Sequence, residues 1–212
     1  MKAARLHAAG EVRIDEVPGL LVTGLQAVED RDFNHHIGVD FSGMLRAVFV
    51  NLKSGGETRQ GASTLTQQLA RSGLLGIGKE QTYRRKFKEI LFALLLEARY
   101  DKRTIMEAYL NQVDLGQNGA QSIRGVAAAS EFWFGKDLRD LKDEQIALLI
   151  GMVKGPSWYN PRRNPERALE RRNFVLKQML DTRLIDEKAY HRAVAAPLGV
   201  TASPGTPNAN RF

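Results

Sequence analysis

The first candidate for chemistry is a carboxylate that ends an apolar helical pattern, in the stretch GLQAVEDRDFNHHIG. Leu21 and Leu25 lie one helical turn apart, and Glu29 follows one turn later on the same face. Burial on that face would raise the pKa of the Glu29 carboxyl toward the range that a general acid or base needs. The alternative is that Glu29 reaches solvent at the helix end and pairs with Arg31, and Glu29 alone favours this alternative.

A second carboxylate lies among basic residues, in YRRKFKEILFALLLEARY. Arg85 and Glu89 are four residues apart and face the same side of a helix, with Lys86 and Lys88 beside them. An ordinary surface ion pair explains this spacing, although the cation-first order is the weaker one for helix stability. Lys154 follows the apolar run IALLIGMV and fits either a helix-terminal cation or a site cation.

The stretch GASTLTQQ places hydroxyl and amide side chains at the start of a short helix. Thr64 and Gln67 fit a capping box, which requires no ligand. A capping box does not explain Ser63, Thr66 and Gln68. A helix start that follows a glycine also offers free N–H groups to an anion, so both a structural cap and an anion site are consistent with the pattern.

Metal and nucleotide sites are not indicated by the sequence. His35 and His36 are adjacent and point in different directions on a helix, and no second ligand cluster accompanies them, so we assign His36 a structural role. The chain has no cysteine, no H-x-x-x-H, no P-loop, no G-x-G-x-x-G and no S-x-x-K. We predict no metal site formed by the protein.

The totals describe an ordinary globular chain of 212 residues with 43% hydrophobic and 26% charged residues, which suggests one domain. Its net charge of +7 suits polyanions such as phosphate-bearing substrates, anionic lipid or nucleic acid. The apolar runs are shorter than the roughly 20 residues that span a bilayer, and the first ten residues lack the apolar region of a signal peptide. We expect neither an anchor nor an export signal in this chain.

The elements that position these side chains are predicted to be mainly helical from residue 19 onward. Apolar spacing predicts helices in residues 38–53, 63–73, 83–100, 102–113, 126–135, 142–153 and 164–180. The stretch DLGQNGAQSIRG reads as a loop, and no strand ladder is predicted. Residues 1–18 read as a loose or strand-like lead-in, and residues 199–212 are rich in Pro, Gly and Asn and predict a disordered tail.

Five motifs, in order along the chain, resemble the peptidoglycan glycosyltransferase domain of glycosyltransferase family 51. This domain occurs in class A penicillin-binding proteins and in monofunctional transglycosylases. The matching residues are Glu29, Asp30, Phe33, His36 and Gly38, then Gly61, Ser63, Thr64, Leu65, Thr66, Gln67 and Gln68, then Arg85, Lys86 and Glu89, then Lys102, Ile105, Glu107, Tyr109, Leu110 and Asn111, and last Arg124, Gly125, Ala128 and Ser130. GMVKGPSWYNP also resembles a later family stretch, with Lys154 at its basic position.

The likeness covers residues 19–198 and implies a lysozyme-like, two-lobed, mainly α domain there. We expect no transpeptidase domain in this chain. After TQQL the family often has Lys-Asn, whereas this chain has Arg71 and Ser72. Arg71 keeps the charge but presents it with a different geometry, and Ser72 lacks the reach of an asparagine amide.

The resemblance implies polymerisation of lipid II into β-1,4-linked glycan strands, with release of lipid pyrophosphate. Glu29 would be the general base that deprotonates the acceptor 4-hydroxyl, and Glu89, the second catalytic carboxylate, would orient nearby cations or support the leaving group. The expected substrate-binding residues are Ser63, Thr64, Gln68, Arg71, Arg85, Lys86 and Lys154. The expected site-shaping residues are Asp30, Phe33, His36, Lys102, Glu107, Tyr109, Asn111 and Arg124.

No organic cofactor is expected, and a divalent cation (Mg or Mn) would fit between the pyrophosphates. The expected partners are lipid II, the growing glycan strand, the outer leaflet of the cytoplasmic membrane and moenomycin-type inhibitors, without nucleic acid. The expected location is the outer face of the bacterial cytoplasmic membrane. The apolar residues that could meet the membrane, or could instead pack in the core, are Phe41, Leu45, Val48, Phe49 and Leu52. The glycine-rich segment 54–61 would then be a mobile lid.

Other functions stay open at this point. A lytic transglycosylase or lysozyme would cleave the same glycan with one glutamate, and the cations beside Glu89 argue against it. A basic nucleic-acid-binding helical module would explain the high pI, although the basic residues cluster with carboxylates. A catalytically inactive scaffold would not need both motif carboxylates.

Overall fold

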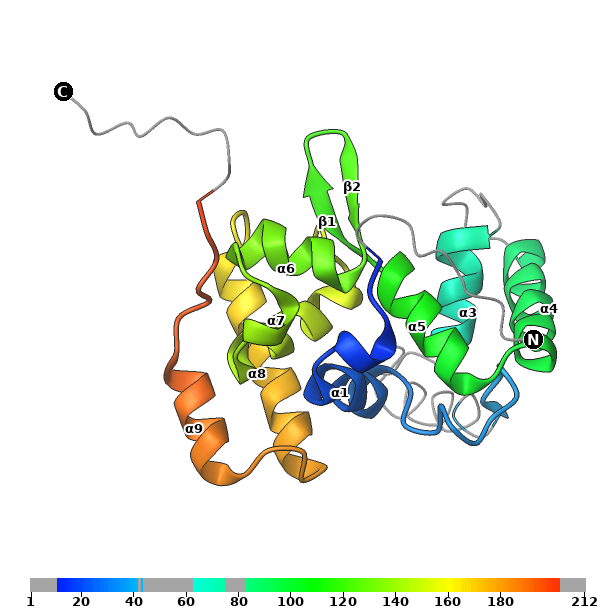
Figure 1. The fold of residues 1–212 in the computed structure, drawn as a ribbon, viewed down its shortest axis with the longest axis horizontal. Helices are drawn as coiled ribbons and strands as arrows, with labels where there is room; N and C mark the ends of the chain where they lie inside the picture. Colours follow the sequence, from blue (N-terminus) through cyan, green and yellow to red (C-terminus); the bar gives the residue numbers. More distant parts are fainter. Residues whose placement is uncertain (1–10, 42, 44–62, 75–82, 203–212) are drawn as a thin grey trace, which may run out of the picture.

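The computed structural model describes residues 11–41, 43, 63–74 and 83–202, and its fold is mainly α, as expected (Figure 1). The elements, in chain order, are η1 (Ile14–Glu16), α1 (Gly19–Glu29), α3 (Leu65–Leu69), the π-helical turn η2 (Ala70–Leu74), α4 (Tyr83–Arg99), α5 (Lys102–Gln112), β1 (Asp114–Asn118), β2 (Gln121–Arg124), α6 (Val126–Phe134), η3 (Leu138–Asp140), α7 (Asp143–Val153), α8 (Pro165–Asp181) and α9 (Glu187–Ala195).

The helices form two groups, which fits the expected two-lobed shape. In one group α3 packs against α4 and α5, and in the other α8 packs against α7 and α9. Helix α1 contacts both α7 and α8, and its last residue is Glu29. Figure 1 shows the two groups on opposite sides of the molecule, with α1 in front of the junction between them. The C-terminal end of α1 therefore brings Glu29 to the boundary between the groups.

Close packing fixes the position of α1. Leu21 and Leu25 are each 2% exposed, so the apolar stripe predicted from their spacing does face the core. A Cβ at Gly24 would lie 2.5 Å from Met179 Cε of α8 and 2.9 Å from Ile150 Cδ1 of α7, distances that real Cβ atoms do not adopt. A glycine at this position thus lets α1 approach both helices, which holds the end of α1 in place.

The loop predicted for residues 114–125 is wrong, because this segment forms a β-hairpin. β1 pairs antiparallel with β2, and Asn118 lies opposite Gln121. Gly119, whose φ is 60°, begins the two-residue turn. Leu115 and Ile123 are the buried side chains of the hairpin. Because these two apolar residues stand among polar ones, the sequence shows no clear alternation of apolar and polar residues. The hairpin depends instead on tertiary contacts, such as the hydrogen bond that Trp133 Nε1 donates to the Leu115 carbonyl at 2.9 Å.

The predicted tail begins too early. Thr201 N donates to the Trp133 carbonyl at 2.8 Å, and Arg162 Nε donates to the Thr201 carbonyl at 3.0 Å. Residues 199–202 are therefore bound to α6 and to the loop before α8, whereas 203–212 lie outside the described residues. The predicted helix over 38–53 falls largely outside the described residues, and the predicted lid over 54–61 lies wholly outside them.

Two helical details also differ from the prediction. The helix expected over 63–73 is α-helical only from Leu65 to Leu69 and continues as the π-helical turn η2. Helix α9 has no counterpart in the predicted elements; its side-chain cap is Asp186, whose carboxylate accepts from Ala189 N at 2.7 Å. Since π-helical turns occur often at functional sites, the change at residue 70 marks the segment that carries Arg71.

Candidate active site

Glu29 lies at the end of α1 with its side chain 14% exposed. Its Oε1 is 3.3 Å from Arg171 Nη2 on α8, and its Oε2 is 3.5 Å from Gln68 Nε2 on α3. Burial raises the pKa of the Glu29 carboxyl, as the stripe predicted, and the charge of Arg171 is the largest opposing influence. The pKa is raised because burial outweighs the cation, so this acid is poised for proton transfer.

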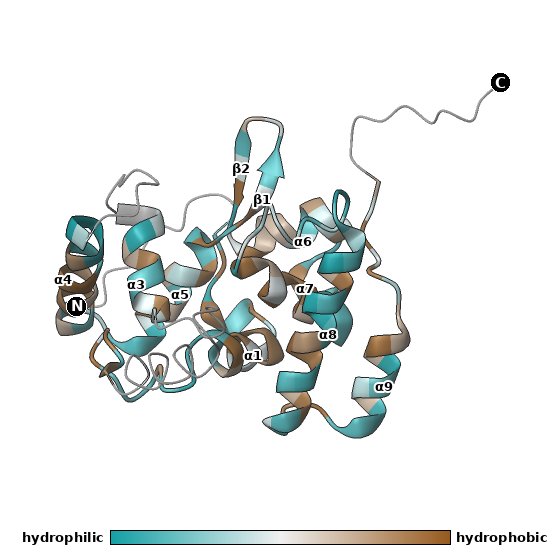
Figure 2. Cartoon of the chain, turned by 180° about the vertical axis from the view of Figure 1, so that it is seen from behind, coloured by the Kyte–Doolittle hydropathy of each residue, from teal (hydrophilic) through white to brown (hydrophobic). Residues whose placement is uncertain are grey.

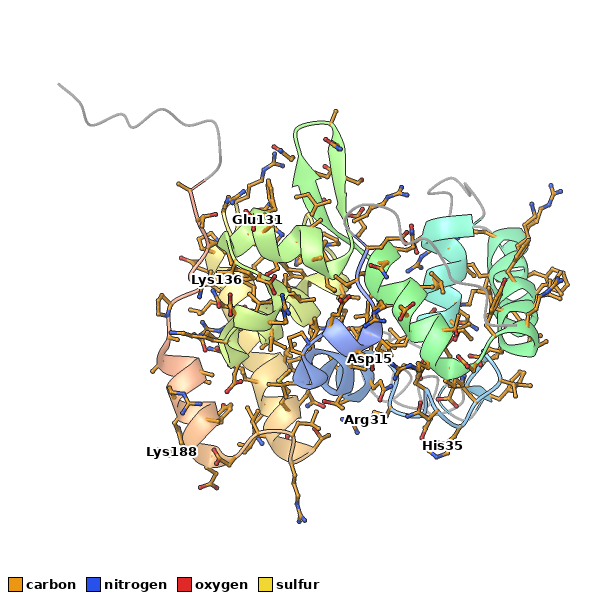
Figure 3. The ribbon with its side chains drawn as sticks, in the orientation of Figure 1. Asp15, Arg31, His35, Glu131, Lys136 and Lys188 are labelled. Carbon is orange, nitrogen blue, oxygen red and sulfur yellow. The ribbon has the colours of Figure 1, made fainter. Side chains whose placement is uncertain are left out.

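Arg31 is not the partner of Glu29. Its Nη2 donates to Gln178 Oε1 at 2.6 Å, and Figure 3 shows Arg31 and His35 on the outside of the molecule, below α1. Both residues are exposed. The solvent-facing alternative for Glu29 therefore does not describe this structure.

Gln68 connects Glu29 to α5. Its side-chain oxygen accepts from the Tyr109 hydroxyl at 2.9 Å, which leaves its NH2 group to face Glu29 Oε2. Tyr109 is buried, and burial, followed by the negative charge of Glu29, raises the pKa of its hydroxyl well above the usual value. The hydroxyl therefore stays protonated and fixes the direction of the Gln68 amide.

Asp30 and His36 join the first motif to the second. Asp30 Oδ2 accepts from Leu65 N and from His36 Nε2, both at 2.9 Å. His36 Nδ1 accepts from Gly38 N at 3.0 Å, so the Nε2–H tautomer fits this arrangement. Thr64 Oγ1 donates to the Gly38 carbonyl at 2.7 Å. The structural role predicted for His36 agrees with these bonds, because they fix the start of α3 against the end of α1.

Lys102 secures the other side of the same segment. Its Nζ donates to the His36 carbonyl at 2.6 Å and to Glu97 Oε1 at 2.7 Å, and it lies 4.7 Å from the centre of the Phe33 ring. Thr66 Oγ1 donates to the same Glu97 oxygen at 2.7 Å. The sequence reasoning missed Glu97, although Thr66, which the capping box left unexplained, was a signal that its helix faced a further polar partner.

A second group of polar side chains joins the start of α3 to α4. Lys86 Nζ donates to Ser63 Oγ at 2.9 Å and to Gln67 Oε1 at 3.1 Å, and it lies 3.6 Å from Glu89 Oε2. Arg85 Nε lies 3.2 Å from Glu89 Oε1. Glu89 is only 1% exposed, so the surface ion pair considered for Arg85 and Glu89 is a buried one. Burial lowers the pKa of Lys86, and Glu89 opposes this effect.

The capping box at the start of α3 is confirmed. Gln67 N donates to Thr64 Oγ1 at 3.1 Å, and Thr64 N donates to Gln67 Oε1 at 3.3 Å. The Gln67 side chain nevertheless also accepts from Lys86, and its buried Nε2 has no hydrogen-bond partner. The cap therefore builds the start of α3 and at the same time positions Lys86 and Ser63.

Arg71 and Lys154 are exposed cations that lie close enough to these groups to affect their pKa values. The charge of Arg71 adds to the lowering of the Lys86 pKa by burial and opposes the rise in the pKa of Tyr109, and the charge of Lys154 opposes the rise in the pKa of Glu29. Neither cation forms a side-chain hydrogen bond or ion pair with the described part of the protein. Both are therefore available to an anionic ligand placed between Glu29 and Lys86.

Three of the expected site-shaping residues lie elsewhere. Asn111 exchanges two hydrogen bonds with the backbone of Val12, at 2.9 and 2.8 Å, and Glu107 Oε2 accepts from Ile14 N at 2.9 Å. They attach the lead-in segment to α5. Arg124 is exposed at the end of β2 and, among the described residues, forms no hydrogen bond with the groups around Glu29. These residues support the fold and do not line the group around Glu29.

The sequence reasoning also missed Arg171. It lies in a helix with several basic residues, where nothing in its spacing distinguishes it from Arg167 one turn earlier. The available signal was Gly151 inside the apolar helix α7, because a Cβ there would lie 3.0 Å from Arg171 Cγ. The structure thus places a largely buried carboxylate, Glu29, and a cation cluster around Lys86 in contact with the same short helix, α3.

None of the described helices is long and apolar enough to cross a membrane. The family model described as Transglycosylase matches residues 4–180. The chain is 48% identical over 189 residues to penicillin-binding protein 1B of Haemophilus influenzae, and 48% identical over 188 residues to penicillin-binding protein 1B of Escherichia coli. Each alignment covers 89% of this chain but only 24% and 22% of the respective relative. The chain thus spans about a quarter of the length of these curated relatives.

The fold also has a counterpart among solved structures. A crystal structure of penicillin-binding protein 1A from Haemophilus influenzae matches 91% of this chain and 18% of that chain, with a TM-score of 0.51 and 23% sequence identity. At this identity the likeness supports the fold, which is the expected lysozyme-like one. The family match and the sequence relatives go further, and they show that the chain belongs to the transglycosylase family, as a glycosyltransferase domain of the class A penicillin-binding protein type.

Proposed function

We propose that this domain polymerises lipid II with Glu29 as the general base. The observation that supports this most is the position of Glu29: it is largely buried, with a raised pKa, and is held by Arg171 and Gln68, while the preceding residue of α3, Gln67, contacts the cluster around Lys86. The Glu29 carboxylate would take the proton from the 4-hydroxyl of the acceptor sugar. That oxygen would attack C1 of the donor from the face opposite the pyrophosphate, which gives a β-1,4 link and releases lipid pyrophosphate.

The cation cluster supplies what this leaving group needs. A departing pyrophosphate requires stabilisation of negative charge more than protonation. Lys86 and Arg85 would bind it, with Arg71 and Lys154 at the open edges. Ser63 already accepts from Lys86, so its own hydroxyl hydrogen is free to bind a phosphate oxygen. A divalent cation (Mg or Mn) would be held by the pyrophosphate itself, because the described residues offer no cluster of three metal-binding side chains.

The structure narrows the roles of the other residues. The Thr64 hydroxyl both donates to Gly38 and accepts from Gln67, so we assign it to positioning α3 and not to substrate contact. Gln68 is committed to Glu29 and Tyr109 and would orient the base. Glu89 would balance the charges of Arg85 and Lys86. A hydrolase would need a protonated acid above the leaving oxygen, whereas this second carboxylate lies between two cations.

The test is direct. The protein is incubated with fluorescent lipid II in detergent, and the products are separated by gel electrophoresis before and after lysozyme treatment. We expect a ladder of glycan polymers that lysozyme digests. A folded protein that makes no polymer, and instead shortens a preformed glycan strand, would show a lytic enzyme and would overturn the proposal.

We further propose that the domain contacts the outer leaflet through one face of α4. Phe87, Leu91 and Leu95 recur every four residues on this helix and are 68%, 44% and 54% exposed. Arg84 and Lys88 are exposed beside them, which suits anionic lipid headgroups. Figure 2 shows the apolar middle of α4 on the outer side of its group of helices. Of the apolar set predicted for residues 41–52, only Phe41 is described in full, and it is 68% exposed.

Replacing Phe87 and Leu91 together by serine should weaken binding to vesicles that contain anionic lipid by roughly tenfold, because each loses part of the free energy of apolar burial. Turnover of long-chain lipid II in those vesicles should fall in parallel, and turnover of a short-chain substrate in detergent should not. Leu169→Ser on α8, where the side chain is 38% exposed, is the matched control. Unchanged vesicle binding by the double variant would show that α4 does not meet the membrane.

A further inference from the structure

Arg171 is held in place by contacts that do not depend on Glu29. Its Nε donates to the Gly151 carbonyl at 3.4 Å, and its guanidinium lies 4.9 Å from the Phe174 ring and 5.7 Å from the Tyr159 ring. The absence of a side chain at Gly151 leaves space for the arginine stem. The side chain is 11% exposed. The guanidinium is therefore preorganised beside the carboxylate that it meets.

The charges around Glu29 come from several elements. Arg171 lies on α8, Lys154 at the end of α7, Asp30 next along the chain and Tyr109 on α5. Asp30 adds a like charge, Tyr109 is neutral, and Lys154 is exposed, so it acts at a distance. Among the described residues, Arg171 is the cation in contact with the Glu29 carboxylate, 3.3 Å away.

We propose that Arg171 is a positioning residue for Glu29, which fixes the direction of Oε1 and balances the charge of a largely buried carboxylate. The proposal rests on the proposed role of Glu29 as the base. Gln68 faces Oε2, so the two contacts together set the plane of the carboxylate. This geometry would point the remaining lone pairs at the acceptor hydroxyl, as a base requires.

The consequence for catalysis has a definite sign. Arg171 is the largest influence that opposes the rise in the pKa of Glu29, so its removal raises that pKa further. A base with a higher pKa is protonated over a wider range of acidic pH. Activity is therefore lost at low pH and recovers as the pH rises. At a fixed low pH, the rate should fall about tenfold for every whole pH step by which the acid limb moves upward.

The test is the pH profile of kcat/KM for polymerisation by Arg171→Met, which keeps an apolar stem and removes the charge. We expect its acid limb to lie at higher pH than in the parent protein. Arg171→Lys should lie in between, because it keeps the charge with a different geometry. Arg167→Met is the matched control, since Arg167 is exposed on the same helix and lies over Trp158, at 3.8 Å. Its profile should superimpose on that of the parent.

A direct titration of the Glu29 carboxyl by carbon NMR, in the parent and in Arg171→Met, gives a second readout that does not depend on turnover. If the pH profile of kcat/KM for Arg171→Met has the same acid limb as that of the parent and is only uniformly lower, the role proposed for Arg171 is overturned. An unchanged pKa of Glu29 in the titration would overturn it as well. If Arg171→Met fails to fold, Arg171→Gln carries the test, because it also removes the charge, and an unmoved acid limb with an unchanged Glu29 titration in that variant would overturn the role equally. Near-parental activity of Glu29→Gln would instead refute the base itself, so the two failures are distinguishable.

Discussion

Replacing Glu29 by glutamine should lower the rate of lipid II polymerisation by at least about 10²–10⁴-fold, the range typical of a lost general base. The amide matches the carboxylate in shape but cannot accept the proton of the acceptor hydroxyl. Binding of the donor should change far less, because among the described residues the contacts of Lys86 are with Ser63, Gln67 and Glu89 and not with Glu29. The measurement is the initial rate with labelled lipid II, together with a thermal melt to show that the variant is folded.

The pH dependence tests the same assignment. Burial raises the pKa of Glu29, so the parental rate should fall as the pH drops through a value above the usual 4.5 of a glutamate. Glu29→Gln should lack this acid limb. A folded variant that polymerises at nearly the parental rate, or that keeps the same acid limb, would show that another group accepts the proton.

The sequence predicted most of the helices because their apolar faces are continuous. Leu21 and Leu25 illustrate this, since their spacing predicted a stripe that does face the core. The same spacing offered a buried Glu29 with a raised pKa as one of two interpretations, and the structure agrees with that one. The hairpin over 114–124 was not predicted, because Leu115 and Ile123 are buried by contacts with distant helices and do not belong to an alternating apolar pattern. Elements could therefore be predicted where buried residues recur periodically along the sequence. They could not be predicted where burial depends on tertiary packing.

The candidate site was predictable to the same extent. Motif spacing correctly grouped Arg85, Lys86 and Glu89, which share one face of α4. Spacing could not predict the partner of Glu29, because Arg171 is 142 residues away and reaches it only through the packing of α8 on α1. Side chains that meet across helices are the part of the site that a single sequence does not specify.

Helix α3 gives the site its organisation. Its start bonds to Asp30 and Gly38, which follow α1, and its next turn carries Gln67 toward Lys86 and Gln68 toward Glu29. Two neighbouring glutamines of one short helix thus contact both groups. A shift of α3 would disturb the contacts of Glu29 and of Lys86 together.

Removal of the Lys86 charge should have the second largest effect. Lys86→Met should weaken binding of lipid pyrophosphates, and of phosphoglycolipid inhibitors of the moenomycin type, by about 1.5–3 kcal/mol, which is roughly 10- to 150-fold. Lys86 Nζ is the atom that connects Ser63, Gln67 and Glu89, so a methionine there removes the cation and leaves Gln67 Oε1 and Glu89 with fewer partners. Titration of a fluorescent inhibitor measures the affinity directly in detergent.

Lys88→Met is the matched control, because Lys88 lies on the same helix but is exposed, and the described ion-pair partners of Glu89 are Arg85 and Lys86. Equal affinities for Lys86→Met, Lys88→Met and the parent would mean that the cluster stabilises the fold and is not a pyrophosphate site.

Replacing Glu89 by glutamine separates these two roles further. If Glu89 serves the leaving group through Lys86 and Arg85, this variant should lose turnover. If Glu89 is only a buried ion-pair partner, the variant should keep its turnover but melt at a lower temperature. The melting temperature falls in that case because removing one member of a buried pair leaves the other charges uncompensated.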